Sequence, residues 1–339
     1  MKKVTLSMPV YNVARFVEKS LLSALNQTYN NIEFLIIDDK STDESMNIVR
    51  QVINSHPRKS EVRVIDHIVN KGLGDTRNTS IIEATGDYIY FMDSDDVITP
   101  DCIERLVAYM NETPVDFIAS SRIRKSFDGK IIANDVYVPA IVKDKGDFGV
   151  VRFRYVENNR ILGEVWNKLY NLDFLRNNNI KCIPGVHVED VSFSFQTIIA
   201  ARSCRLVADI TYTYHIYEGQ SFAAFRTDRQ RALYLGDCFC KIREWDCAIA
   251  LRYKDRPEYG AVLSAIYNVT LLHSNMVRKA KALSSKDKRQ IFSRLLAYNR
   301  GLMSTICTKT NKKKNCLYYF VSKMPYSMQN CILKIIYKG

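Results

Sequence analysis

Three carboxylates lie within four residues at the end of an apolar run. Residues 88–92 have the composition of a buried strand, and Asp93, Asp95 and Asp96 follow it directly. Two carboxylates about 4 Å apart repel each other by roughly 4 kcal/mol at an effective dielectric constant near 20. So much like charge indicates either a bound cation or a solvated turn.

Polar clusters also follow two earlier strands. The residue patterns predict strands at 4–10, 32–37, 62–68 and 88–92, with a helix after Asn12 as its cap, another after a capping box at 41–44, and a third at 74–84. The first two strands end in polar clusters at 9–12 and 38–43. The fourth strand ends in the cluster at 93–96. Ligands bind at the carboxyl ends of strands in open α/β sheets, so we expect the three clusters to meet at one site.

This alternation predicts an α/β fold with a mostly parallel, Rossmann-like sheet and flanking helices. Beyond residue 120 the pattern is less regular, with a short strand at 166–170, a helix at 191–201 and a β-rich stretch at 206–217. From about residue 228 the chain is expected to be largely helical, and a capping box at Ser284 and Asp287 predicts an amphipathic helix over 284–302.

The positive charge is concentrated near the C-terminus. The 339 residues carry a formal charge of +13, and 47% of them are hydrophobic, as expected of a folded globular protein. Fifteen Lys or Arg residues and one acid, Asp287, lie in 278–339, so this segment carries +14 and the rest of the chain −1. Nine cysteines lack zinc-ligand spacing, which indicates free thiols in a reducing compartment. We expect neither a signal peptide at the N-terminus nor a membrane-spanning helix.

Six short segments together resemble the inverting family 2 glycosyltransferases with a GT-A fold. They occur in the order typical of that family: PVYN (9–12), IIDDKSTD (36–43), NKGLGDTRN (70–78), DSDD (93–96), WNKLY (166–170) and VED (188–190). A dinucleotide-binding GxGxxG is absent, because Arg77 stands where the third glycine would be, and so is a P-loop.

The resemblance implies a nucleotide-sugar site with a divalent cation. Asp95 would bind Mg²⁺ or Mn²⁺, and Asp93 would bind the metal or the ribose; for Asp96 a helix N-cap is the alternative. Asp39 would accept a hydrogen bond from the base, whereas Asp38 is equally suited to capping the next turn. Three further residues would line the base pocket: Pro9, Tyr11 and Asn12.

The resemblance also implies which residues act on the acceptor hydroxyl. Asp190 would be the general base, with Glu189 as the substitute candidate. Arg77 would point to the donor or pair with the Asp cluster, unless it forms a structural salt bridge.

Three residues would shape the substrate site. Trp166 would pack against the sugar or belong to the core, and Lys168 would shape the site. His215, in YHIYEGQS (214–221), replaces an arginine that many relatives carry, which leaves its contact with the diphosphate open.

The implied function is metal-dependent, inverting, non-processive transfer from a UDP-sugar to a glycan or lipid-linked acceptor in surface polysaccharide synthesis. Residues 1–225 would form the GT-A domain, with the donor half at 1–120 and the acceptor half at 121–225, and 226–339 a helical region. The tail at 278–339 would contact an anionic membrane or form a helical lid, placing the protein in the cytoplasm or on the inner membrane face; no nucleic-acid partner is expected. The rival functions are a sugar-nucleotide nucleotidyltransferase and a non-catalytic basic binding protein on the same fold.

Overall fold

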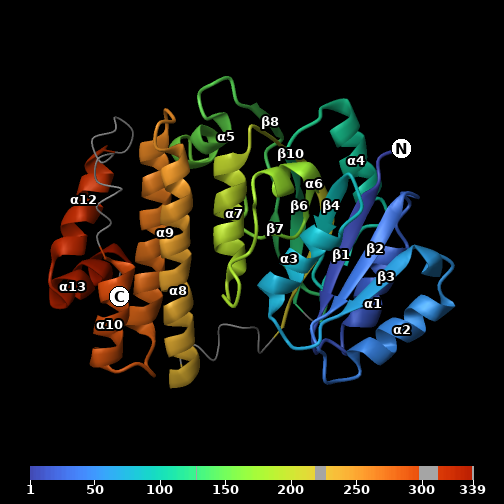
Figure 1. Cartoon of the computed structure of the whole chain (residues 1–339), viewed down its shortest axis with the longest axis horizontal. Coiled ribbons are helices and arrows are strands. Elements are labelled where there is room, and N and C mark those ends of the chain that lie inside the picture. Colours follow the sequence, from blue (N-terminus) through green and yellow to red (C-terminus); the bar gives the residue numbers. More distant parts are fainter. Residues whose placement is uncertain (127, 218–226, 298–311, 338–339) are drawn as a thin grey trace. The chain divides into compact units, whose positions relative to one another are not determined.

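The computed structural model describes residues 1–126, 128–217, 227–297 and 312–337 (Figure 1). These residues form two compact units. Unit 1 comprises Met1–Asp144, Arg160–Gly185 and Glu189–Tyr217, and unit 2 comprises Lys145–Asn159, Val186–Val188 and the described part of Glu218–Gly339. The predicted division at residue 225 falls in 218–226, outside the described residues, and stays a prediction.

Unit 1 is built on one sheet with the strand order β3-β2-β1-β4-β9-β6-β10-β5. The pairs β3-β2, β2-β1 and β1-β4 are parallel, as the sequence predicted, and the remainder is mixed. β7 and β8 pair with β6 and β10. The strands are β1 (Val4–Val10), β2 (Ile32–Asp38), β3 (Val62–Asp66), β4 (Tyr88–Phe91), β5 (Val97–Ile98), β6 (Phe117–Ser126), β7 (Ile131–Asp135), β8 (Ala140–Lys143), β9 (Lys168–Asn171) and β10 (Ser203–Ile216).

Helices flank this sheet (Figure 1). They are α1 (Val17–Leu25), α2 (Ser45–Ser55), η1 (Lys59–Glu61), α3 (Leu73–Glu83), α4 (Cys102–Glu112), α6 (Leu172–Asn177) and α7 (Glu189–Ala200). Strands β1, β2 and β4 are buried along their whole length, as expected of strands in a sheet that is covered on both faces.

Two predicted helix starts are wrong. α1 begins at Val17, and Asn12 does not cap it: Asn12 has a φ of 52°, and its Oδ1 accepts a hydrogen bond from Thr42 N at 2.8 Å. α2 begins at Ser45 without a side-chain cap from Glu44. In both cases the polar side chains are used for turns at the ends of strands.

Unit 2 is helical. Figure 1 shows α8 and α9 as two long neighbouring helices. Its elements are α5 (Gly149–Val151), η2 (Arg152–Val156), α8 (Arg229–Ala250), η4 (Leu251–Tyr253), α9 (Tyr259–Lys279), α10 (Ser285–Leu295), α12 (Lys312–Lys323) and α13 (Tyr326–Ile336). The predicted capping box of Ser284 and Asp287 is present, and Arg229 pairs with Asp287 at 2.9 Å. Residues 298–302 of the predicted helix lie outside the described residues.

The core of unit 2 is formed mainly by α8, α9, α10 and α13. Phe239, Phe292 and Leu333 are among its most buried side chains. No helix in the described part of the chain is both long and apolar enough to cross a membrane.

Candidate functional site

The polar clusters meet at one edge of the sheet. β2, β1 and β4 are adjacent and parallel, so their carboxyl ends lie side by side. Asp39 follows β2, Asn12 follows β1 and Asp93 follows β4. The convergence expected from the sequence is therefore present.

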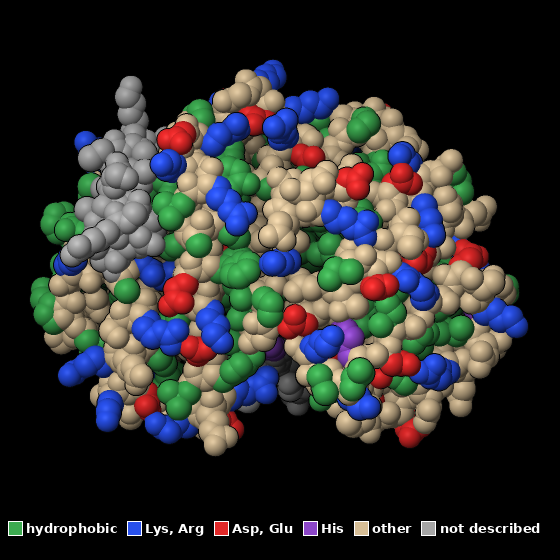
Figure 2. Space-filling view, viewed as in Figure 1, with side chains coloured by type: hydrophobic (Ala, Val, Ile, Leu, Met, Phe, Trp, Pro, Cys, Tyr) green, Lys and Arg blue, Asp and Glu red, His purple; other side chains and the backbone are tan. Residues whose placement is uncertain are grey.

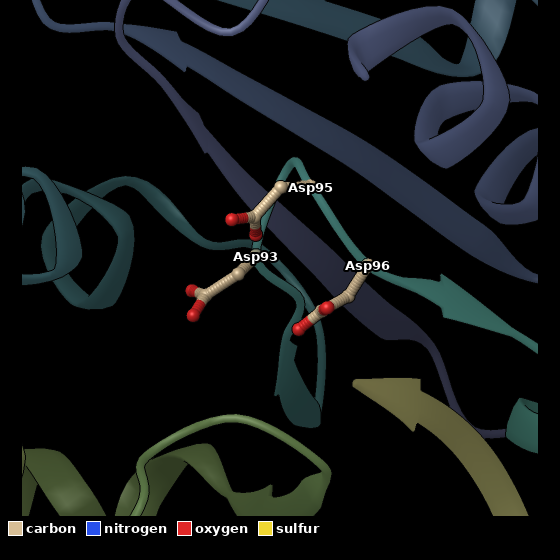
Figure 3. Close-up of side chains that lie close together, drawn as sticks. All are labelled: Asp93, Asp95 and Asp96. Atoms are coloured by element: carbon tan, nitrogen blue, oxygen red, sulfur yellow. The ribbon is translucent and has the colours of Figure 1, made fainter. Parts of the chain in front are cut away.

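Asp93, Asp95 and Asp96 form a compact acidic cluster. Each offers a carboxylate oxygen, and these atoms lie within 4.8 Å of one another. In Figure 3 the three side chains leave the short turn between β4 and β5. Carboxylate oxygens are the ligands that Mg²⁺ and Mn²⁺ prefer, so the donor set fits such an ion.

Asp96 is the most deeply buried of the three carboxylates. It is fully buried and accepts hydrogen bonds from Tyr212 Oη at 2.7 Å and from His215 N at 2.8 Å. Burial raises its pKa well above the usual range. It is not a helix N-cap, because Asp101 occupies the N-cap position of α4.

Asp95 is tied to the end of β10. Its Oδ2 accepts a hydrogen bond from Tyr217 Oη at 2.8 Å, and the Tyr217 ring stacks on Phe16 with centroids 4.8 Å apart. Burial raises the pKa of Asp95. The tyrosine therefore fixes the direction of one carboxylate oxygen and leaves other lone pairs for a ligand.

Arg77 joins the acidic cluster to the start of α7. Its Nη2 donates to Asp93 Oδ1 at 2.8 Å, and its Nη1 donates to Glu189 Oε1 at 2.7 Å and to Asp190 Oδ1 at 2.6 Å. Arg77 is only 1% exposed. Arg77 thus pairs with one residue of the Asp cluster and also forms buried salt bridges to α7, so both of these alternatives are present, and a contact with the donor stays a prediction.

The two acidic residues of α7 differ in access to solvent. The side chain of Asp190 is 31% exposed, and that of Glu189 is 6% exposed. Burial raises the pKa of Glu189 to about 7. The negative charge of Asp190 also raises this pKa, and the positive charge of Arg77 lowers it. Burial likewise raises the pKa of Asp93 to about 6 against the effect of Arg77. Of the α7 pair, Asp190 is thus the residue whose side chain is more accessible to solvent.

Two glycines allow the NKGLG segment to reach this site. Gly72 has a φ of +88°, which side-chain-bearing residues rarely adopt. A Cβ on Gly74 would lie 3.1 Å from Cys182 Cβ and 3.4 Å from Glu189 Cβ. A glycine at this position lets α3, and with it Arg77, lie close to α7.

Asp39 is held by three hydrogen-bond donors. Its Oδ1 accepts from His67 Nδ1 at 2.8 Å and from Lys71 N at 2.9 Å, and its Oδ2 accepts from Gly72 N at 2.7 Å. His67 is buried, and its Nε2 lies 3.0 Å from Thr79 Oγ1. Sequence reasoning missed this partner, because His67 shows no ligand spacing.

The other predicted base-pocket residues lie beside Asp39 at the same edge. Pro9 is buried within β1, Tyr11 is 47% exposed, and Asn12 stabilises the turn that contains Thr42. Asp38 accepts a hydrogen bond from Ser41 N at 2.8 Å, which is the turn-capping alternative.

The predicted substrate-shaping residues are buried or partly buried around the cluster. Trp166 stacks on Tyr212 with centroids 4.5 Å apart, and Lys168 Nζ donates to the Glu164 carbonyl. Burial lowers the pKa of both Lys168 and His215. The backbone N–H of His215 donates to Asp96, and its ring Nδ1 lies 3.8 Å from Asp96 Oδ1. Their roles toward a substrate stay predictions, and residues 218–221 of YHIYEGQS lie outside the described residues.

Residues 5–167 match the family described as "Glycosyl transferase family 2". The chain carries a glycosyl transferase family 2 domain. It is 32% identical to the "Putative glycosyltransferase EpsH" of Bacillus subtilis (strain 168), over 63% of this chain and 61% of EpsH. It is also 28% identical to the "Uncharacterized glycosyltransferase YibD" of Escherichia coli (strain K12), over 63% of this chain and 62% of YibD. The chain thus matches about three fifths of the length of these relatives.

Solved structures with a similar fold are also found. The match to S. aureus TarS 1-349 in complex with UDP-GlcNAc has a TM-score of 0.58 and 16% identity, and covers 85% of this chain and 90% of that one. The mannosyltransferase PcManGT from Pyrobaculum calidifontis, in complex with GDP-Man and Mn²⁺, matches with a TM-score of 0.52 and 18% identity over 94% and 86% of the two chains. The family 2 domain has the GT-A fold.

Proposed function

We propose that this chain is a metal-dependent, inverting glycosyltransferase. It would transfer a sugar from a UDP-sugar to a hydroxyl group of a glycan or lipid-linked acceptor in surface polysaccharide synthesis. The observation that carries this proposal is the buried Arg77, whose guanidinium contacts both the Asp93 carboxylate and the Asp190 carboxylate. Arg77 and Asp93 lie within the segment that matches family 2. A donor-phosphate site and a general base must be adjacent for such a transfer.

Asp190 acts as the general base. It takes the proton of the acceptor hydroxyl as that oxygen forms a bond to the anomeric carbon and the bond to the diphosphate breaks on the opposite face. The Arg77 guanidinium holds the Asp190 carboxylate in place at 2.6 Å, and the partly exposed position of that carboxylate leaves it open to an acceptor hydroxyl.

Asp95 and Asp93 would hold the divalent cation. When bound, Mg²⁺ or Mn²⁺ would offset the negative charge of the leaving diphosphate as a Lewis acid. The Tyr217 hydroxyl orients Asp95 and Arg77 orients Asp93, so both carboxylates are positioned before the ion binds. The structure of PcManGT with GDP-Man and Mn²⁺ supports the use of a metal.

The hydrogen bonds of Asp39 favour a uracil base. A carboxylate has about four acceptor sites, and His67, Lys71 and Gly72 fill three of them. One acceptor site remains, which matches the single ring N–H of uracil. Guanine presents two neighbouring donors on its pairing edge and cytosine presents an acceptor, so both fit this site less well. TarS in complex with UDP-GlcNAc is consistent with this choice.

A nucleotide panel tests the donor. In the presence of Mn²⁺ we expect UDP to raise the melting temperature of the full chain more than GDP or CDP does, since a ligand at a hundred times its dissociation constant adds about 2.7 kcal/mol. dTDP keeps the ring N–H but lacks the 2′-hydroxyl and carries an added methyl group on its base, so it reports these two changes together. Asp39→Asn should remove the preference for UDP.

Asp66→Asn is the matched control, because Asp66 pairs in register with Asp38 and its side chain is 55% exposed. This variant should respond like the wild type. A larger shift with GDP or CDP than with UDP would contradict the UDP-sugar assignment. If no nucleotide changes the melting temperature, the alternative function of a non-catalytic basic binding protein would be favoured.

We place the enzyme at the inner face of the cell membrane, held there by the basic segment 278–339. A lipid-linked acceptor would then lie within reach of a chain whose described helices do not cross the bilayer.

A further inference from the structure

The last two helices of unit 2 expose apolar side chains. On α12, Leu317 and Phe320 are 56% and 60% exposed, and on α13, Met328 and Ile335 are 50% and 76% exposed. Spacings of three and seven residues place each pair on one side of its helix. Figure 2 shows hydrophobic side chains on the surface at the end of unit 2 that holds these helices.

Another side of each helix is already packed. Tyr318 and Val321 of α12 and Leu333 of α13 are at most 8% exposed. Tyr318 and Leu333 belong to the core of unit 2, and both helices contact α9. The exposed stripe is therefore a second apolar face, separate from the side chains that form this core.

The positive charge of these helices indicates which class of partner fits the exposed apolar side chains. Their sequences, KKKNCLYYFVSK and YSMQNCILKII, contain five lysines and no Asp or Glu. Lys312, Lys313 and Lys334 are exposed. A second copy of this chain docked face to face would bring like charges together. A nucleic acid would pair with the lysines but would leave Leu317, Met328 and Ile335 in water.

We propose that the α12–α13 face, formed by Leu317, Phe320, Met328, Ile335 and the lysines beside them, docks on a bilayer that contains anionic lipid. A bilayer interface accepts apolar side chains at the acyl boundary and cations at the headgroups. This narrows the membrane contact proposed for 278–339 to two helices. Its biological purpose rests on the proposed function, but docking itself needs neither donor nor metal.

Co-sedimentation of the full chain with vesicles tests this surface without any nucleotide. We expect binding to phosphatidylcholine vesicles that contain phosphatidylglycerol and much weaker binding to pure phosphatidylcholine. The double variant Leu317→Ser with Phe320→Ser should lower the partition coefficient about tenfold or more. Lys313→Glu with Lys334→Glu should lower it by a similar factor, about tenfold, and should remove its dependence on salt.

The matched control is Val138→Ser, which removes an apolar side chain that is 84% exposed on unit 1 and should bind as the wild type does. All substituted side chains are exposed, so unchanged melting temperatures will show that folding is intact. Docking through this face is excluded if the wild type does not bind anionic vesicles, or if both double variants bind as well as the wild type. It is equally excluded if sedimentation velocity shows a dimer that the Leu317 and Phe320 substitutions dissociate, while vesicle binding is unaffected.

Discussion

Asp190→Asn will abolish sugar transfer while donor binding persists. The substitution keeps the shape of the side chain but removes the basic oxygen, and loss of a general base typically lowers the rate by about 10²–10⁴-fold. Asp190 contacts Arg77 and not the acidic cluster, so UDP with Mn²⁺ should still raise the melting temperature. Steady-state kcat and the UDP-dependent melting shift measure the two effects separately.

Glu189→Gln is the contrasting variant for this test. Glu189 shares Arg77 with Asp190, but its side chain is nearly inaccessible to solvent, so kcat should fall less than with Asp190→Asn. The opposite ranking, with Glu189→Gln inactive and Asp190→Asn active, would exchange the roles of the two residues.

Arg77→Met will destabilise unit 1 strongly. The change leaves the carboxylates of Asp93, Glu189 and Asp190 without their shared cation. Removing one partner from a buried ionic group typically costs about 3–5 kcal/mol, because the remaining charge stays buried and unpaired. We expect the free energy of unfolding to fall by about this amount.

Fluorescence can report the unfolding of unit 1 selectively. The chain has two tryptophans, Trp166 in unit 1 and Trp245 in unit 2, so urea unfolding in a Trp245→Phe background follows Trp166. The control is Arg50→Met, since Arg50 forms a pair with Asp66 in which both side chains are more than half exposed. That pair should contribute about 0–1 kcal/mol. Equal effects of the two substitutions would show that Arg77 does not organise the site.

The parallel half of the sheet was predictable because its signals are local. Runs of mainly apolar residues mark β1, β2 and β4, and the acidic residues after β4 are close together in the sequence. Tyr212 and Tyr217 could not be found in this way. They lie 116 and 122 residues from the carboxylates they contact, and only the pairing of β10 with β6 and β5 brings them near.

The wrong helix starts have a related physical cause. Asn12 has a side chain that suits a helix cap, but such a side chain also accepts hydrogen bonds in turns. Asn12 accepts from Thr42 N, which is 30 residues away in sequence, and no local pattern reports that contact. The sequence also contained no signal that 145–159 and 186–188 belong to unit 2, because both segments are separated from α8 by elements of unit 1.

The central claim is that the acidic cluster supports metal-dependent cleavage of a UDP-sugar. Its most direct test is the release of UDP from a panel of UDP-sugars by the purified full chain, with Mn²⁺ or with EDTA, for the wild type and Asp95→Asn. We expect slow release of UDP from at least one donor that requires Mn²⁺ and is lost in Asp95→Asn. Release of UDP that is unchanged by EDTA and by Asp95→Asn would contradict the assignment of the cluster.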